Sequence, residues 1–265
     1  MNASMPLPKY HQVYLVLREQ LHEGKFSDGV PGELVLMQQF SVARVTIRRA
    51  LSQLAQEGLI QREPGRGTRT LLQHRGGHND TTYPNPHRAR LTGLLENLVS
   101  MGLRTSVKVL SVQRLPAPNE VASILQMKGG ELAQKAQRVR YTRDGPLSHI
   151  TTWVPDRLAR GFGRKELAQK PILMLLEESG VKVGSARQSI SAKLADAVIA
   201  QHLGVAVGSA LLAVSRLIYD IDDNPIQWLQ GLYRPDRYEY QMQLSRVGSI
   251  DAKVWVNKEL SANFH

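Results

Sequence analysis

The feature that most restricts the fold of this chain is an internal repeat in its C-terminal half. The segment VASILQMKGGELAQKAQRVRYTRDGPLSHITTWVPDR at 121–157 is similar to IAQHLGVAVGSALLAVSRLIYDIDDNPIQWLQGLYRPDR at 199–237. Chance similarity is the alternative, but the number of matches in one register favours a duplication. At an offset of 78 residues the matched pairs include Leu125 and Leu203, Gly130 and Gly208, Arg138 and Arg216, Tyr141 and Tyr219, and Asp144 and Asp222.

Each repeat has the pattern of a short helix, a glycine turn, a strand, an Asp/Pro turn and a second strand. Two such αββ units predict one antiparallel sheet with helices on a face, related by a pseudo-two-fold axis, so the fold class is α+β. Helices expected at 92–101 and 171–179 would cover this sheet. The crevice between the two halves is the expected place for a small ligand.

The N-terminal region has the periodicity of three helices, followed by two short strands around the turn PGRG. The third helix, at about 43–57, has two different faces at about 100° per residue. One face is apolar and must pack inward: Ile47, Ala50, Leu51 and Leu54. The opposite arc carries Val45, Arg48, Arg49, Ser52 and Gln56, with Arg44 and Thr46 at its flanks. The arginines therefore project away from the core.

The basic charge is concentrated around this helix. The chain has a formal net charge of +11, which indicates a polyanionic partner, either nucleic acid or an anionic membrane surface. A diffuse basic surface is the other explanation of such a charge. Residues 41–75 contain seven arginines against Glu57 and Glu63, and this concentration favours nucleic acid.

Helices followed by a β-hairpin predict a winged helix-turn-helix domain that binds double-stranded DNA. A helix fits the major groove and presents its N-terminal residues to base edges. A hairpin tip close to the duplex needs glycine for access and a cation for phosphate or the minor groove. A solvated cationic helix beside an ordinary hairpin is the alternative. The predicted DNA contacts are Arg44, Val45, Thr46, Arg48, Arg49, Gly65, Arg66 and Gly67.

Composition and linker signals complete the domain organisation. No apolar run reaches about 18 residues, no signal peptide is visible, and cysteine is absent, which fits a soluble cytoplasmic protein. No metal site or cofactor is predicted. The polar, Gly- and Pro-containing segment after residue 74 marks a boundary. The expected organisation is a DNA-binding domain at 1–74, a linker at 75–90, a ligand-binding and dimerisation domain at 91–247, and a tail at 248–265.

The segment VPGELVLMQQFSVARVTIRRALSQLAQEGLIQREPGRGT resembles the DNA-binding region of GntR-family bacterial repressors. The resemblance implies that Arg44, Thr46, Arg48 and the Gly65–Gly67 wing contact the operator. Two positions depart from the family pattern. Leu34 replaces an arginine at the start of the second helix, which implies a missing contact to DNA. Ala43 replaces the serine that usually caps the third helix, a loss of about 1 kcal/mol of helix stability.

The segments LPAPNEVASIL, RVRYTRDGPL, WVP and LYRPDRY resemble the effector-binding (UTRA) domain of the HutC subfamily of GntR regulators. That domain shares its fold with chorismate lyase, and in relatives the ligand lies between the repeats. The resemblance implies that Arg138 and Arg140 meet an anionic group of the ligand. Glutamates common in relatives are replaced by Ile150 and Gln230, which disfavours an amino-sugar ligand. The predicted effector contacts are Arg138, Arg140, Thr152, Trp153, Gln230 and Tyr233.

We therefore expect a ligand-responsive transcription regulator. The resemblance to the family implies that it is a repressor. Its expected partners are operator DNA, an organic anion or phosphorylated metabolite, and a second copy of the chain, with no membrane. The alternatives are an enzyme of the chorismate-lyase-like fold acting on a small organic acid, and an RNA- or protein-binding winged helix. Arg138 and Arg140 alternate along a strand and so share one sheet face, which suits either an anion site or a solvated face.

Overall fold

The computed structural model describes residues 8–26, 29–63, 67–71, 105–247 and 254–264. The chain divides into two compact units. The N-terminal unit combines Met1–Tyr83 with Leu194–Ala210, and the C-terminal unit combines Pro84–Lys193 with Leu211–His265. The linker predicted at 75–90 and the helix predicted at 92–101 lie outside the described residues, so both stay predictions.

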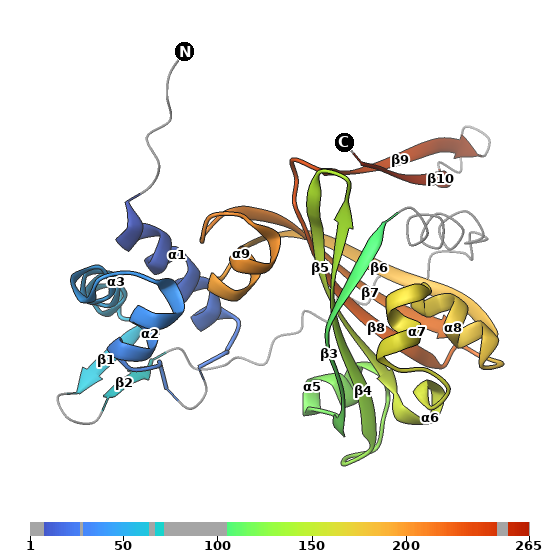
Figure 1. Cartoon of the computed structure of the whole chain (residues 1–265), viewed down its shortest axis with the longest axis horizontal. Helices are drawn as coiled ribbons and strands as arrows, with labels where there is room; N and C mark the ends of the chain where they lie inside the picture. Colours follow the sequence, from blue (N-terminus) through green and yellow to red (C-terminus); the bar gives the residue numbers. More distant parts are fainter. Residues whose placement is uncertain (1–7, 27–28, 64–66, 72–104, 248–253, 265) are drawn as a thin grey trace. The chain divides into compact units, whose positions relative to one another are not determined.

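The N-terminal unit contains the winged helix-turn-helix that the sequence predicts. Its two strands pair in antiparallel register, with Glu63 opposite Gly67 next to the turn. Its core is formed by apolar side chains from all three N-terminal helices and from the first strand. In chain order the elements are α1 (Lys9–His22), α2 (Glu33–Phe40), α3 (Arg44–Gln56), β1 (Ile60–Glu63), β2 (Gly67–Thr70) and α9 (Ala197–Leu203) (Figure 1).

Helix α3 has the two faces that its periodicity predicts. The four residues expected to face inward are almost completely buried: Ile47, Ala50, Leu51 and Leu54. At its start, Ala43 occupies the N-cap with extended backbone angles and makes no side-chain hydrogen bond to the helix. The helix therefore begins without the side-chain acceptor that a serine would supply.

Helix α9 belongs to the N-terminal unit, although in sequence it lies inside the second repeat. Asp196 caps it by accepting a hydrogen bond from the Ile199 backbone N–H at 2.9 Å. Ala197 and Val207 pack against the core of the winged helix. Just before the helix, the Leu194 backbone N–H donates to the Glu19 carboxylate of α1 at 3.1 Å. The sequence did not predict this packing.

The C-terminal unit is built on a six-stranded sheet with the order β3-β4-β5-β8-β7-β6. The pairings between its four central strands are antiparallel. Its sheet strands are β3 (Ser106–Pro116), β4 (Leu132–Thr142), β5 (Gly145–Pro155), β6 (Val183–Leu194), β7 (Ala210–Asp220) and β8 (Pro225–Tyr233). Its helices are α5 (Asn119–Ile124), α6 (Asp156–Ala159), α7 (Arg164–Gln169) and α8 (Ile172–Glu178). Helix α8 confirms the helix predicted at 171–179.

The strand order is the one that two αββ units produce. The last strands of the two repeats, β5 and β8, pair at the centre of the sheet, with Trp153 opposite Trp228. The first strands, β4 and β7, flank them, and β3 and β6 close the edges. The sheet is therefore symmetric about the line between the repeats.

The sheet has two covered faces with different partners. On one, which we call the α8 face, Ala136, Val154 and Ile218 pack with apolar residues of α7 and α8. On the other, which we call the α5 face, Trp153 and Trp228 pack with residues of α5. Alternate residues of each strand point to opposite faces, so the register assigns every central side chain to one of these two environments.

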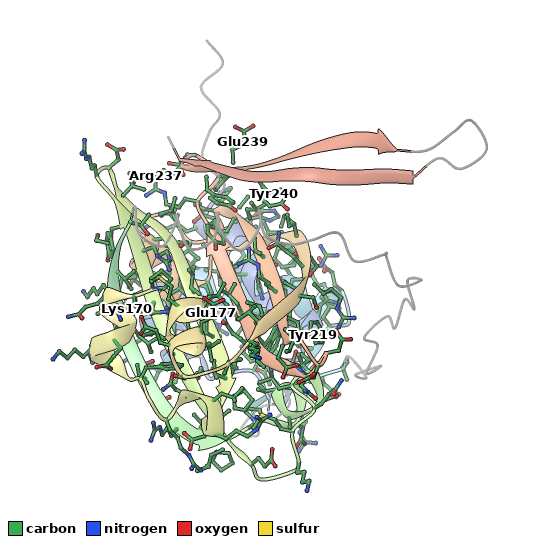
Figure 2. The ribbon with its side chains drawn as sticks, turned by 90° about the vertical axis from the view of Figure 1, so that its right-hand side faces the viewer. Lys170, Glu177, Tyr219, Arg237, Glu239 and Tyr240 are labelled. Atoms are coloured by element: carbon green, nitrogen blue, oxygen red, sulfur yellow. The ribbon has the colours of Figure 1, made fainter. Side chains whose placement is uncertain are left out.

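The chain ends in a two-stranded ribbon, β9 (Tyr238–Val247) and β10 (Val254–Phe264). The strands pair from Tyr238 opposite Phe264 to Val247 opposite Val254. Figures 1 and 2 show this ribbon beyond one end of the sheet strands, where it forms a separate two-stranded sheet. The segment expected to be a tail at 248–265 therefore contains strand β10. Within the described residues, no helix is long and apolar enough to cross a membrane.

Replacing Ala43 with serine should stabilise the N-terminal unit. A serine hydroxyl at the N-cap accepts a hydrogen bond from an otherwise unpaired backbone N–H, worth about 1 kcal/mol. Urea denaturation followed by circular dichroism should show a corresponding rise in the free energy of unfolding. The control is Ala55→Ser, the same change near the other end of α3, which gains no cap. Equal effects of the two changes would contradict the assignment of Ala43 as an unfilled cap.

Candidate functional site

The outward face of α3 presents the predicted cations to solvent. The side chains of Arg44 and Arg48 are 66% and 63% exposed, and Val45 is 72% exposed. A basic face with an apolar residue between its cations can meet phosphates, base edges and thymine methyl groups. Thr46 is half-buried at the helix start, where its backbone N–H donates to the Ala43 carbonyl at 3.0 Å.

Glu33, the first residue of α2, organises these arginines. Its carboxylate accepts hydrogen bonds from Arg44 Nε at 2.7 Å and from Arg62 Nη2 of β1 at 2.6 Å. Arg48 Nε lies 3.8 Å from the same carboxylate. The hydrogen bond from Arg44, aided by the charges of Arg44, Arg62 and Arg48, holds the Glu33 pKa below its usual range. Sequence reasoning missed Glu33 and Arg62; the only signal was an acid in the first turn of α2.

Arg49 differs from the other predicted DNA contacts. Its guanidinium lies 3.9 Å from the centre of the Tyr10 ring of α1, a cation–π contact inside the unit. This contact packs Arg49 of α3 onto α1, and a contact of Arg49 with DNA stays a prediction. Gly65 and Arg66 at the wing tip lie outside the described residues, and Gly67 begins β2.

The predicted effector residues gather partly on the α8 face of the sheet. One row across the four central strands contains Arg138, Ile150, Gly231 and Val214. The neighbouring row contains Arg140, Ser148, Tyr233 and Leu212. Arg138, Arg140 and Tyr233 therefore share one face, as the alternation in the sequence predicts for the two arginines.

Arg138, Arg140 and Tyr233 line a cavity of about 40 Å³ between the sheet and the start of α8, which we call the arginine cavity. The cavity lies over both repeats, at the crevice that the duplication predicts. The start of α8, from Pro171 to Leu173, contributes to its lining. The rest comes from β4, β5, β7 and β8, including Arg138, Arg140, Arg216, Gln227 and Tyr233.

Arg138 is the most unusual side chain of the cavity. It is only 2% exposed, and its Nε and Nη1 atoms have no hydrogen-bond partner among the described residues. Burial, with the nearby charge of Arg140, lowers the Arg138 pKa to about 9, so the guanidinium is still protonated at pH 7. A buried cation without an anion is costly, and a bound anion would remove that cost.

Two further buried arginines, Arg140 and Arg216, line the same cavity as Arg138. Arg140 donates through Nη1 to Thr105 Oγ1 at 2.9 Å. Arg216 donates through Nε to Gln188 Oε1 at 2.8 Å and through Nη2 to the same oxygen. Burial lowers the pKa of both guanidiniums. Arg216 was recognised only as the repeat counterpart of Arg138, because its place in the cavity depends on strand register.

Tyr233 lines the cavity together with the three buried arginines. It acts electrostatically on all three arginines, and its ring stacks on Tyr238 with 4.4 Å between ring centres. A Cβ on Gly231 would come within 2.6 Å of the Tyr233 ring. Only glycine at 231 therefore lets this ring lie against the sheet.

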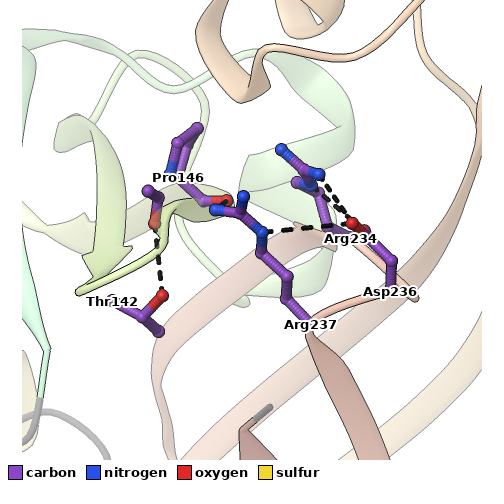
Figure 3. Close-up of polar contacts among 6 residues, drawn as sticks. Thr142, Pro146, Arg234, Asp236 and Arg237 are labelled. Carbon is purple, nitrogen blue, oxygen red and sulfur yellow. Dashed lines mark hydrogen bonds and ion pairs between the residues drawn. The ribbon is translucent and has the colours of Figure 1, made fainter.

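The turn between β8 and β9 holds the two stacked tyrosines. Arg234 donates to the Asp236 carboxylate through Nε at 3.1 Å and through Nη2 at 2.6 Å. Arg237 Nη1 donates to the Pro146 carbonyl at 3.2 Å, which ties the turn to the β4–β5 hairpin (Figure 3). The PDR motif at 235–237 thus fixes the chain direction between Tyr233 and Tyr238.

The remaining predicted effector residues are placed differently. Thr152 is buried on the α8 face, where its hydroxyl reaches the Ala136 carbonyl at 3.5 Å. Trp153 is buried on the α5 face, and Gln230 pairs across the sheet with Thr151 on that face and is exposed. Trp153 and Gln230 therefore lie on the other face of the sheet from this cavity, and their contact with the effector stays a prediction.

A larger, open groove of about 550 Å³ lies beside α6, α7 and α8. It is lined by charges of both signs, and Lys170 and Glu178 form an ion pair at 2.7 Å. Figure 2 labels Lys170 and Glu177 in this region. Because Lys170 and Glu178 already neutralise each other, binding of an ion should be less favourable in this groove than in the arginine cavity. Among the described residues, no group of metal-binding side chains comes together.

Two known domain families match successive parts of the chain. Residues 100–239 match the UTRA domain, and residues 9–70 match the bacterial regulatory proteins of the gntR family. The chain belongs to the GntR family of regulators that carry a UTRA domain.

Relatives of this GntR regulator extend over nearly its whole length. The HTH-type transcriptional repressor NagR of Bacillus subtilis is 26% identical over 93% of this chain and 98% of its own length. The Probable transcriptional regulator PhnF of Escherichia coli K12 is 29% identical over 89% of this chain and 95% of its own. These relatives are transcriptional regulators, and nothing in them supports the enzyme alternative.

A solved structure of a related ligand-binding domain has the same fold as the C-terminal unit. It belongs to a GntR-family transcriptional regulator from Bordetella bronchiseptica and is 32% identical, with a TM-score of 0.51. The match covers 53% of this chain and 91% of the solved chain. The sheet that carries the arginine cavity is therefore the ligand-binding module of this family.

Replacing Arg138 with methionine should not destabilise this GntR regulator in the absence of ligand. Methionine removes a buried charge that has no anionic partner, so the free energy of unfolding should stay equal or rise by about 1–4 kcal/mol. Denaturation in urea measures this change. Arg187→Met, an exposed arginine on β6, is the control and should change the free energy by less than about 0.5 kcal/mol.

The difference between wild type and Arg138→Met should also depend on pH. Below pH 9 both the folded and the unfolded wild type carry the Arg138 proton, so the full cost of burial is present. Above the folded-state pKa of about 9 the unfolded state binds more protons, so wild-type stability should rise with pH relative to the variant. A large loss of stability in Arg138→Met at every pH would instead show that the arginine is needed for packing.

Proposed function

We propose that this GntR regulator is a homodimeric repressor that binds operator DNA through α3 and releases it when a small organic anion enters the arginine cavity. The observation that carries the effector assignment is Arg138, a buried guanidinium with two nitrogen atoms that have no hydrogen-bond partner in the part of the chain that the structure describes. The names of two relatives support repression: NagR, and the mannosyl-D-glycerate system repressor MngR of Escherichia coli K12, which is 23% identical.

The DNA-contacting surface consists of Arg44, Val45 and Arg48 on α3 with Arg62 on β1. The exposure of the α3 side chains supports this assignment. The carboxylate of Glu33 also supports it, because it orients the guanidiniums of Arg44, Arg48 and Arg62 in the absence of DNA. Orientation before binding reduces the entropy lost on binding. The wing tip, Gly65–Gly67, adds a phosphate or minor-groove contact.

Two copies of the chain present two α3 helices to a palindromic operator. Winged helix dimers of this kind read half-sites about 34 Å apart, one turn of the duplex. The effector changes DNA affinity by binding one arrangement of the protein better than the other, with a typical coupling of 1–3 kcal/mol.

The connection between cavity and DNA-binding unit runs through β6 and β7. Gln188 on β6 accepts from Arg216 on β7, and these strands lead directly into and out of the segment that contains α9. Because α9 packs on the winged helix core, a ligand that moves Arg216 acts on the strands that hold this helix.

Replacing Arg44 or Arg48 with alanine should weaken operator binding by about 1–3 kcal/mol each and reduce the salt dependence of binding by about one phosphate contact. An operator selected from random duplexes, titrated by fluorescence anisotropy at several salt concentrations, provides the measurement. Arg49→Ala is the matched control on the same helix. Its guanidinium stacks on Tyr10, so this change should lower stability and leave operator affinity nearly unchanged. Equal losses of affinity in all three variants would contradict the assigned surface.

Replacing Glu33 with glutamine should lower specificity while raising non-specific affinity. The change keeps the side-chain shape but releases Arg44, Arg48 and Arg62 from a shared anion. Binding to random duplex should tighten and its salt dependence steepen, by about 0.9 per added phosphate contact, while the preference for the operator falls. Glu57→Gln, which removes the carboxylate that accepts from Tyr14, is the control. An unchanged operator preference in Glu33→Gln would show that Glu33 has no orienting role.

A further inference from the structure

We propose that the arginine cavity takes a ligand with two anionic groups joined by a short apolar chain, and that Arg216 binds the second of these groups. Arg138 and Arg140 bind the first group. The inference rests on the anionic effector proposed above and specifies its chemical class. It assigns a binding role to a residue of the second repeat that the resemblance to known effector domains did not indicate.

The duplication places one arginine from each half of the sheet at the same cavity. Arg138 on β4 and Arg216 on β7 are equivalent positions of the two repeats, and both line the cavity although β5 and β8 lie between their strands. Arg138 lies in the same cross-strand row as Gly231 of β8, and Arg216 lies directly opposite Leu229 of β8. The two guanidiniums therefore approach from opposite sides of the space in front of β5 and β8.

The charge of Arg216 is not neutralised within the described part of the chain. The side chain is 4% exposed, and it donates through Nε and Nη2 to a neutral amide oxygen, Gln188 Oε1. The groups that act on its pKa besides burial are three tyrosines, none of them a carboxylate. A buried arginine with a purely structural role is usually paired with an acid. A glutamate at 188 would supply that acid with almost the same shape, yet the chain has glutamine.

The space between the two cationic ends is largely apolar. Its apolar lining consists of Ile150, Ile172, Leu173, Ile218 and Leu229. Gln227 is a polar exception, with an Oε1 atom that has no hydrogen-bond partner among the described residues. Several sugar hydroxyls would lose hydrogen bonds to water against the apolar side chains, at a cost in affinity. The ligand class is therefore a diacid with a largely apolar linker and at most a single hydrogen-bond donor near Gln227, with either carboxylate or phosphonate as the anionic groups.

The size of the cavity also favours a short ligand. Its volume of about 40 Å³ is far below the ~300–1,000 Å³ of typical small-molecule pockets. A diacid can enter only if the Tyr233 ring or the first turn of α8 moves. Tyr233 lies within electrostatic reach of all three arginines, so its ring is the group that a bridging ligand displaces.

The test is calorimetric titration of the full-length protein with matched mono- and dianions. Glutarate and pentanoate have the same number of carbons and differ in one carboxylate. The pair 3-phosphonopropionate and propylphosphonate makes the same comparison with phosphonate as the first group and so distinguishes the two sources of charge. Wild type should bind the dianion of at least one pair about 10- to 100-fold more tightly, the gain expected for hydrogen bonds to a charged group.

Three variants assign the effect to residues. Arg216→Met should remove the preference for the dianion and leave the affinity for the monoanion nearly unchanged. Gln188→Glu should do the same while keeping Arg216, because the new carboxylate occupies its donors; it also tests the idea if Arg216→Met folds poorly. Arg138→Met should abolish binding of both members of each pair.

Two results would overturn the two-ended ligand. One is a wild type that binds monoanion and dianion equally well. The other is a similar loss for both members of a pair in Arg216→Met and in Gln188→Glu, which would give Arg216 a structural role. If no tested anion binds wild type, or if Arg138→Met binds all of them as wild type does, the anionic effector itself is refuted. The first two results, with binding still abolished in Arg138→Met, refute only the role of Arg216.

Discussion

Uncompensated positive charge buried on one face of a β-sheet is the constraint on which the C-terminal unit depends. Among the described residues, Arg138 has two nitrogen atoms without hydrogen-bond partners, and Arg216 donates to an amide oxygen. Each arrangement costs free energy that apolar packing elsewhere must offset, chiefly the cluster between the sheet and helices α7 and α8. Proteins commonly retain such destabilising features where they are needed for function. The charge, the apolar cover and the glycine beneath Tyr233 are the features on which the proposed anion site rests.

The duplicated architecture explains how a small domain can surround a ligand with like charges. A pseudo-two-fold axis between β5 and β8 brings equivalent positions of both repeats to the same cavity, so one arginine position supplies two guanidiniums. The symmetry is broken elsewhere. Helix α5 packs on the sheet, whereas its counterpart α9 packs on the winged helix core. Both repeats therefore contribute strands to the sheet, but the helix of the first repeat covers the sheet and the helix of the second belongs to the DNA-binding unit.

In the DNA-binding unit, by contrast, the positive charges are exposed and paired with a carboxylate. Its arginines are exposed, and they share a carboxylate, Glu33, that holds three of them in place. Exposed ion pairs of this kind add little stability, so their value lies in orientation. Leu34 is 70% exposed next to Glu33, at the position where the resemblance to GntR-family repressors implies an arginine. Arg62 of β1 shares the Glu33 carboxylate with the α3 arginines.

The sequence by itself predicted the three N-terminal helices, the outward direction of Arg44 and Arg48, the missing cap at Ala43 and one antiparallel sheet built from two repeats. These features depend on local periodicity or on duplication, both of which can be read along the chain. It also showed that Arg138 and Arg140 share a face, because alternation in a strand is local. The same alternation separates Thr152 from Trp153 and Tyr233 from Gln230, but it does not say which member of each pair meets the cavity. Only the tertiary structure decided that, together with the stacking of Arg49 on Tyr10, the bond of Glu33 to Arg62, the place of Arg216 and the packing of α9. Each of these joins residues far apart in sequence, and such contacts are set by strand register and core packing rather than by any local pattern.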